Sequence, residues 1–202
     1  MQPCFPCSHL GVMIGNSLFD DRTIKRKTMS HPLERFKYCP VCGSNDFIAN
    51  SEKSKKCQNC GFEYFMNPSS ANVAFILNEK GELLVTRRKN EPAKGTLDLP
   101  GGFADIGESA EEGVIREVKE ETGLIVTKAT YLFSFNNTYL YSNLNIPTLD
   151  LFYLCEVENC DELHAADDAE DCLWVPLKEI RVEEFGLQSL RRGIERFLSM
   201  NT

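Results

Sequence analysis

The amino-acid sequence predicts an α/β protein in which a mixed β-sheet packs between helices, preceded by a small metal-bound module. Apolar strand-like segments and two helical segments alternate along residues 67–202. Ahead of them, residues 37–66 carry two closely spaced cysteine pairs on a stretch too short to bury much core. With 202 residues and 42% hydrophobic composition, the chain suits one core-forming domain and one smaller module.

The N-terminal segment, residues 1–36, shows neither helical nor strand periodicity, and we expect an irregular extension there. Residues 1–28 of it are interpreted as an extension or a misassigned start. Cys4 and Cys7 form a CxxC pair with His9 nearby. Because no second ligand pair accompanies them, incidental thiols are favoured over a metal site.

Four cysteines within residues 37–66 have the spacing of a zinc site. They form two pairs, each with two intervening residues and each followed by glycine: Cys39, Cys42, Cys57 and Cys60. Such a turn directs both sulfurs at one ion, and the glycine relieves backbone crowding. Two turns complete a closed tetrahedral shell, so the segment is interpreted as a zinc ribbon with structural Zn²⁺ that supplies folding energy. The competing interpretation, a redox dithiol, would not require two matched pairs.

The strands of the main domain are predicted from apolar runs bounded by turn residues. Residues 72–77 and 83–88 are expected to form a β-hairpin around the turn "NEKGE". A short strand at residues 97–100 is expected to lead into a pair of glycines. Further strands are predicted at residues 125–135, 149–157 and 172–176.

Two helices are predicted in the same domain. The first covers residues 109–122, with Ser109 as N-cap, Glu112 completing a capping box and Gly123 as the C-terminal glycine. The second lies in residues 187–200. Its apolar side chains share one face and are Leu187, Leu190, Ile194, Phe197 and Leu198.

The first helix concentrates carboxylates beside its apolar stripe. At roughly 100° per residue, the stripe consists of Ala110, Val114, Ile115, Val118 and Thr122. Glu117, Glu120 and Glu121 fall on the adjoining arc. The residues expected on the far side are Arg116, Glu112 and Lys119. Half-buried carboxylates that repel one another need a cation, and hard oxygen ligands suit Mg²⁺ or Mn²⁺. A solvated acidic face is the alternative, which the position beside the stripe disfavours.

The same stretch resembles the signature of the Nudix hydrolase family, G-x5-E-x7-R-E-U-x-E-E-x-G-U with U apolar. The matching residues are Gly102, Glu108, Arg116, Glu117, Val118, Glu120, Glu121, Gly123 and Leu124. The resemblance implies a Nudix α/β/α sandwich with a mixed sheet over residues 67–202. It also implies metal-dependent hydrolysis of the pyrophosphate bond in a nucleoside diphosphate derivative, either ADP-ribose-like or a dinucleotide such as NADH.

The resemblance also implies roles for individual residues. Glu117, Glu120 and Glu121 would hold catalytic Mg²⁺ or Mn²⁺, together with the backbone carbonyl of Gly102. Arg116 and Glu108 would orient these ligands through ion pairing, and all five side chains are candidate catalytic residues. A further carboxylate outside the helix commonly assists, and an exposed acidic loop is the equal alternative for each candidate. The candidates are Asp167, Asp168, Glu170 and Asp171.

A zinc ribbon ahead of a Nudix domain resembles the NADH pyrophosphatases and some ADP-ribose pyrophosphatases. Two departures argue against specificity for NADH. The typical SQPWPFP motif is replaced by "FSFNNTYLYSNLNIP", and LPGGF stands at residues 99–103 where LAGF is usual. Phe135, Tyr139 and Tyr141 are aromatic candidates for stacking a base, or are core residues.

Composition narrows the classes of binding partner that the chain could have. A net charge of −8 disfavours nonspecific binding to nucleic acid or membrane surfaces, although "EKSKK" at residues 52–56 gives the ribbon local positive charge. No apolar run approaches the length of a membrane span, so a cytoplasmic protein with a nucleotide-derived small-molecule substrate is expected. A homodimer is left open. The alternative function is a non-catalytic ligand-sensing or protein-interaction module that uses the ribbon as its binding surface.

Overall fold

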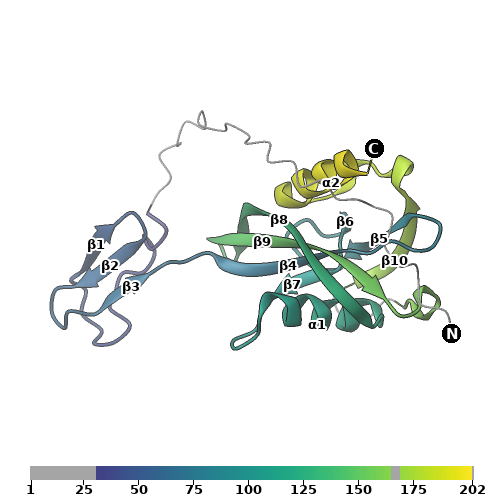
Figure 1. The fold of residues 1–202 in the computed structure, drawn as a ribbon. Coiled ribbons are helices and arrows are strands. Elements are labelled where there is room, and N and C mark those ends of the chain that lie inside the picture. Colours follow the sequence, from purple (N-terminus) through teal and green to yellow (C-terminus); the bar gives the residue numbers. More distant parts are fainter. Residues whose placement is uncertain (1–30, 165–168, 202) are drawn as a thin grey trace. The chain divides into compact units, whose positions relative to one another are not determined.

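A computed structural model describes residues 31–164 and 169–201 of the chain. The chain divides into two compact units, with the boundary between Pro68 and Ser69 in the described part (Figure 1). The predicted limits of the extension, ribbon and main domain remain predictions. The expectations for Cys4, Cys7 and His9 lie outside the described residues.

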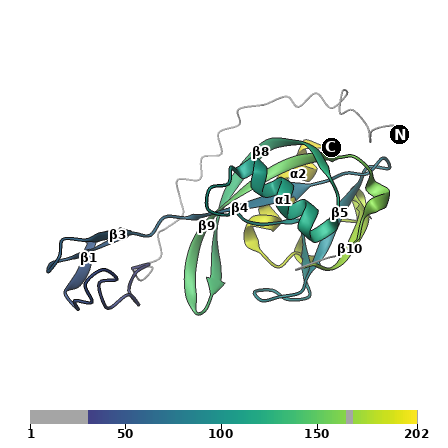
Figure 2. The same cartoon turned by 90° about the horizontal axis from the view of Figure 1, so that it is seen from below.

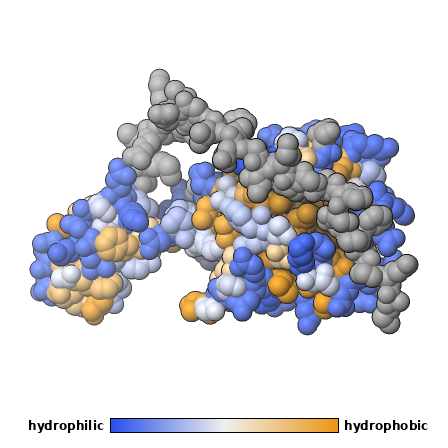
Figure 3. Space-filling view, viewed as in Figure 1, coloured by the Kyte–Doolittle hydropathy of each residue, from blue (hydrophilic) through white to orange (hydrophobic). Residues whose placement is uncertain are grey.

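The smaller unit is a three-stranded antiparallel sheet in the order β1-β2-β3. Its strands are β1 (Phe47–Ser51), β2 (Ser54–Cys57) and β3 (Glu63–Phe65). Its buried cluster is small and consists of Cys39, Phe47 and Cys57, with Phe36 and Phe62 packed against it. Hydrophobic side chains also reach its surface (Figure 3), among them Val41, Ile48 and Phe65. This unit therefore has little apolar core to stabilise it.

The larger unit contains two sheets. The four-stranded sheet has the order β7-β4-β9-β8 and is mixed, because β4 and β9 run parallel while its other pairs are antiparallel. Its strands are β4 (Ser69–Phe75), β7 (Gly101–Phe103), β8 (Val126–Tyr141) and β9 (Leu144–Val157). The three-stranded antiparallel sheet has the order β10-β5-β6. Its strands are β5 (Glu82–Arg88), β6 (Leu97–Asp98) and β10 (Ala169–Pro176).

Helices α1 (Ala110–Thr122) and α2 (Gln188–Met200) lie on opposite sides of the strands (Figure 1). Val114 and Val118 of α1 pack with Ala74 in one buried cluster. Leu190 and Phe197 of α2 belong to a second cluster. Short 3₁₀ turns cover Cys160–Glu162, Leu177–Glu179 and Val182–Glu184. The predicted α/β/α sandwich with a mixed sheet is confirmed, and none of the described helices has the length and apolarity to cross a membrane.

Helix α1 begins and ends at the predicted residues. The Glu112 N–H donates to Ser109 Oγ at 3.2 Å, and the Ser109 N–H donates to Glu112 Oε2 at 2.8 Å, which completes the capping box. Gly123 ends the helix with φ of 71°. Ile115, predicted on the buried stripe, is instead 39% exposed.

Two strand predictions differ from the structure. The expected hairpin of residues 72–77 and 83–88 forms only beside its turn, where Leu77 and Leu83 make an antiparallel bridge and the Leu84 N–H donates to the Ile76 carbonyl at 2.9 Å. Beyond this bridge β4 and β5 join different sheets. The strand predicted to end at residue 135 continues to Tyr141, then turns back into β9. Within β9, only residues 148–154 pair with β4. The far end of the β8–β9 hairpin therefore extends beyond the sheet (Figure 2).

Candidate active site and metal centre

Arg116 on α1 connects the acidic residues around it. Its Nε donates to Glu108 Oε1 at 2.7 Å. Its Nη1 donates to Glu117 Oε1 at 2.9 Å and to Glu120 Oε2 at 2.8 Å, and its Nη2 donates to the carbonyl of Phe103 at 3.1 Å. The guanidinium lowers the pKa of Glu108, and the hydrogen bond to Glu108 raises the pKa of Arg116. The prediction that Arg116 lies on the far side of the helix is wrong, because its long side chain turns toward the acidic residues.

The three glutamates have different surroundings. The Glu117 side chain is 15% exposed, and burial raises its pKa. The Glu120 side chain is 46% exposed. Glu121 Oε2 accepts a hydrogen bond from the Gly101 N–H at 3.0 Å. This bond ties the last turn of α1 to the start of β7.

Gly102 lies directly against Glu117. A Cβ added to Gly102 would be 2.5 Å from Glu117 Oε1, so the backbone reaches the carboxylate only because residue 102 has no side chain. Carboxylate and carbonyl oxygens are the ligands that Mg²⁺ and Mn²⁺ prefer. The residues present therefore fit a divalent cation, with Glu117, Glu120, Glu121 and the Gly102 carbonyl as candidate ligands.

A cleft of about 380 Å³ opens beside these groups. What we call the α1 end of the cleft is lined by Glu117, Glu121, Gly101 and Gly102. What we call the α2 end is lined by Asp98, Asp150, Asn137, Thr148, Leu187 and Leu190. Arg88, Phe103 and Tyr139 also line the cleft. The two ends therefore present different chemistry to a bound molecule.

The α2 end contains two carboxylates, of which Asp150 is buried and Asp98 is half-buried. Asp150 is 5% exposed and accepts hydrogen bonds from Thr148 Oγ1 at 2.7 Å, Asn137 Nδ2 at 3.2 Å and Ser189 Oγ at 2.5 Å. Asp98 forms an ion pair with Arg88. Burial raises the pKa of Asp98. Sequence reasoning missed both residues, although an aspartate inside an apolar strand run, as in "LDLP" and "LDLFYL", was a usable signal.

The sequence-predicted aromatic residues separate in the structure. Tyr139 lines the cleft, where its ring meets Phe103 edge-on with centroids 5.5 Å apart. Phe135 packs against the core cluster around Phe133 and Phe152. Tyr141 is 65% exposed on the hairpin. Of the three, only Tyr139 lines this cleft.

The candidate assisting carboxylates are largely outside the described part of the chain. Asp167 and Asp168 lie outside the described residues, and so does the side chain of Glu170. Asp171 is exposed on β10. Their assignment stays a prediction.

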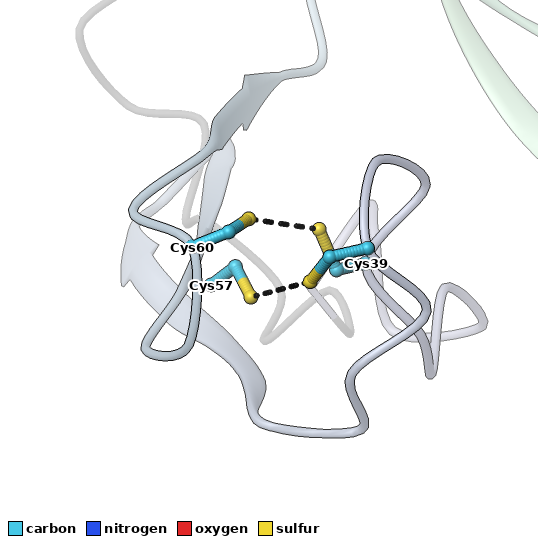
Figure 4. A group of neighbouring side chains, drawn as sticks. Cys39, Cys57 and Cys60 are labelled. Atoms are coloured by element: carbon cyan, nitrogen blue, oxygen red, sulfur yellow. Dashed lines mark hydrogen bonds between the residues drawn. The ribbon is translucent and has the colours of Figure 1, made fainter.

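The four ribbon cysteines converge in the smaller unit (Figure 4). Their sulfur atoms all lie within 4.8 Å of one another, and these residues are Cys39, Cys42, Cys57 and Cys60. The Sγ atoms of Cys39 and Cys60 are 3.7 Å apart, and those of Cys42 and Cys57 are 3.6 Å apart. A disulfide would be about 2.05 Å long. A tetrahedron of Zn–S bonds of about 2.3 Å has edges of about 3.8 Å, so the cluster fits one zinc ion.

The two cysteine turns share one backbone geometry. The Gly43 N–H donates to the Cys39 carbonyl at 2.9 Å, and the Gly61 N–H donates to the Cys57 carbonyl at 3.0 Å. The two glycines have φ of 72° and 77°, a left-handed conformation that glycine adopts readily. Hydrogen bonds from the Ser44 backbone and the Asn59 side chain lower the pKa of Cys42 to about 6, whereas hydrogen bonds with the other cysteine thiols raise the pKa of Cys60 to about 12. The two thiols therefore titrate as a coupled pair.

Comparison with known proteins places the larger unit in a family. The family model described as NUDIX domain matches residues 66–197. An ADP-ribose pyrophosphatase of Methanocaldococcus jannaschii is 33% identical over 119 residues, which are 59% of this chain and 68% of that protein. The NAD-capped RNA hydrolase NudC of Photobacterium profundum is 26% identical over 167 residues, which are 83% of this chain and 59% of that protein.

Solved structures share the fold. A NUDIX hydrolase from Nitrosomonas europaea superposes with a TM-score of 0.63 at 17% identity, over 81% of this chain and 90% of that one. A MutT protein from Methanosarcina mazei superposes with a TM-score of 0.57 at 29% identity, over 69% of this chain and 99% of that one. The matched region contains the cleft and the whole α1 carboxylate cluster. The chain therefore belongs to the NUDIX domain family.

Proposed function

We propose that this chain is a metal-dependent pyrophosphohydrolase that cleaves the pyrophosphate bond of a nucleoside diphosphate derivative, either ADP-ribose or a dinucleotide such as NADH. The observation that carries this proposal is that Glu117 and Glu121 of α1 line a cleft of about 380 Å³ together with Gly101 and Gly102. The names of the relatives support the substrate class. The chain spans 59% of the length of the NudC relative from Photobacterium profundum, so the whole protein's substrate is part of the proposal.

Glu117, Glu120, Glu121 and the Gly102 carbonyl are proposed to hold Mg²⁺ or Mn²⁺. When bound, such a metal neutralises phosphate charge and lowers the pKa of a bound water. The protein's contribution is to hold the carboxylates in place. Arg116 bridges Glu117 and Glu120, and Glu108 in turn anchors Arg116. The Gly101 N–H fixes Glu121.

The four-cysteine cluster is proposed to hold one structural Zn²⁺. Its sulfur separations of 3.6 and 3.7 Å match the edges of a zinc tetrahedron. Four thiolates fill the shell, which leaves no position for a substrate. The proposed role of the zinc is therefore to fold the smaller unit.

The test of the activity is a substrate screen with product identification. Purified full-length protein would be incubated with Mg²⁺ or Mn²⁺ and ADP-ribose, NADH, dinucleoside polyphosphates, nucleotide sugars or nucleoside triphosphates. Cleavage of ADP-ribose should release AMP and ribose 5-phosphate, and cleavage of NADH should release AMP and reduced nicotinamide mononucleotide. Hydrolysis of none of these compounds with either metal would reject the proposed function.

A further inference from the structure

We propose that the α2 end of the cleft binds the adenine base of the substrate, with the carboxylate of Asp150 accepting a hydrogen bond from the 6-amino group. This inference deepens the proposed function and rests on it. It assigns an orientation to the substrate, with the pyrophosphate at the α1 end and the nucleoside at the α2 end.

The side chains in direct contact with Asp150 do not suit a phosphate. Asp150 is 5% exposed, and the donors that surround it are the hydroxyls of Thr148 and Ser189 and the amide of Asn137, all of them neutral. None of these neutral groups offers the cationic donor that a phosphate usually binds in proteins. Asp98 adds a second carboxylate at this end, although Arg88 compensates it. An uncharged group that donates hydrogen bonds suits the surface better.

Asp150 retains an acceptor position for such a group. A carboxylate offers about four lone-pair positions on its two oxygens. Oδ2 accepts from Asn137 and Ser189, whereas Oδ1 accepts from Thr148. Asp98 is less suitable, because it binds both the Leu99 N–H and the Arg88 guanidinium. Oδ1 of Asp150 is thus the acceptor assigned to the amino group.

The other lining side chains favour a flat ring over a sugar diol. Leu99 and Leu190 contribute apolar surface to the cleft. The rings of Phe103 and Tyr139 meet edge-on at 5.5 Å between centroids, and Phe103 is 42% exposed. The Tyr139 hydroxyl is held by Arg88 Nη2 at 3.4 Å. Stacking on an aromatic face is a common source of affinity for bases.

The test compares two nucleotides that differ at the group Asp150 would recognise. AMP carries a 6-amino donor, whereas IMP carries a 6-oxo acceptor that would face the carboxylate. Calorimetric titration of the wild-type protein in Mg²⁺ should show AMP binding at least tenfold more tightly than IMP, because a buried unmatched polar pair is costly. The same preference should appear in kcat/KM for ADP-ribose over its inosine counterpart.

Asp150→Asn supplies the discriminating variant. Its amide can donate to the 6-oxo group of IMP. The ratio of the affinity for AMP to the affinity for IMP should therefore fall at least tenfold, to about one or below. The hydroxyls of Ser189 and Thr148 both donate and accept, so they can bond the new amide and the fold should persist. Glu195→Gln, the same neutralisation at an exposed position on α2, should leave the preference unchanged.

Two results would overturn the assignment. Wild-type protein that binds AMP and IMP equally, or binds neither, would exclude adenine recognition here without any variant. An Asp150→Asn protein that weakens both nucleotides equally would show that Asp150 acts through the fold or through the ribose. The failure of the proposed function is distinguishable, since it would appear as a wild-type protein that prefers AMP but hydrolyses none of the screened compounds.

Discussion

The cysteine cluster and the glutamate cluster both carry proposed ligands for a metal, but they are built in different ways. The cysteine sulfurs lie within 4.8 Å of one another at the ends of two matched backbone turns. The glutamates stand on one helix, and Arg116 bridges Glu117 and Glu120 through its guanidinium. In the first region the ligands converge on a point, and in the second a side-chain cation separates two of them.

The surrounding core explains the difference. The smaller unit buries a cluster of Cys39, Phe47 and Cys57, so two of its proposed metal ligands are also core residues. Helix α1 is instead capped at both ends and packs Val114 and Val118 into a large cluster. We therefore expect a metal at the cysteines to contribute to folding, and a metal at the glutamates to contribute to function on a helix that is already stable. The predictions below test this contrast, from the largest effect to the smallest.

The largest expected effect follows zinc removal. Elemental analysis of the purified protein should find about one zinc equivalent, as a single four-cysteine site requires. Cys57→Ser should release the zinc and abolish the dispersed NMR signals of residues 37–66, because metal binding and folding are coupled there. Cys160→Ser, a thiol outside the cluster, is the matched control and should keep both. A zinc-free protein with an intact ribbon spectrum would contradict the assignment.

The second effect is confined to turnover. Glu120→Gln keeps the size of the side chain but removes one proposed metal-binding charge, so kcat should fall by about two orders of magnitude or more, since metal contributes several kcal/mol at the transition state. The melting temperature without divalent ions should change little, because the relieved carboxylate repulsion offsets the weakened ion pair with Arg116. Mg²⁺ should stabilise the wild type more than the variant.

Glu195→Gln serves as the control for this substitution, because Glu195 is an exposed glutamate on the other helix. It should match the wild type in rate and in its response to Mg²⁺. Wild-type turnover by Glu120→Gln would show that Glu120 has no metal role. It would then support the solvated acidic face as the interpretation of this residue.

The third effect separates two neighbouring glycines. A Cβ on Gly102 would be 2.5 Å from Glu117 Oε1, which is the end of a side chain, so Gly102→Ala should displace Glu117 and lower kcat about tenfold or more while costing about 1 kcal/mol of stability. A Cβ on Gly101 would be 2.0 Å from the backbone oxygen of Asn72. Gly101→Ala should therefore cost about 2 kcal/mol or more, since the strand pairing must shift. Denaturant melts and kinetics on both variants would test this, and equal losses of stability would contradict it.

Local rules account for what the sequence predicted well. The capping box of Ser109 and Glu112 and the glycine at residue 123 depend on neighbours within four positions, and both were predicted. The cysteine spacing was equally local. The hairpin prediction held only beside the turn, because the strand partners of β4 are β7 and β9, which lie farther along the chain. Strand pairing at that separation leaves no trace in the periodicity of one segment.

The candidate site shows the same division. The glutamates were found from spacing on one helix, and the pairing of Arg116 with Glu108 was expected from the family resemblance, but the helix wheel placed Arg116 on the wrong side. Its side chain reaches Glu108 and the Phe103 carbonyl, which precede α1, and no wheel of α1 residues contains them. Asp150 was missed because its partners Asn137 and Ser189 come from β8 and α2. The placement of Arg116 and Asp150 depends on contacts between elements, which the pattern of a single segment does not show.

The smallest expected effect tests whether α1 is stable without metal. Ser109→Ala removes the side-chain acceptor of the capping box, so the free energy of unfolding should fall by about 1 kcal/mol. The loss should be the same with and without Mg²⁺, because the cap and the glutamates are separate parts of the helix, and kcat should change less than twofold. Ser199→Ala near the end of α2 is the matched control, which should cost nothing measurable because alanine favours a helix. If Ser109→Ala lost stability only in the absence of Mg²⁺, metal binding would be holding α1 together, and the contrast between the two clusters would be wrong.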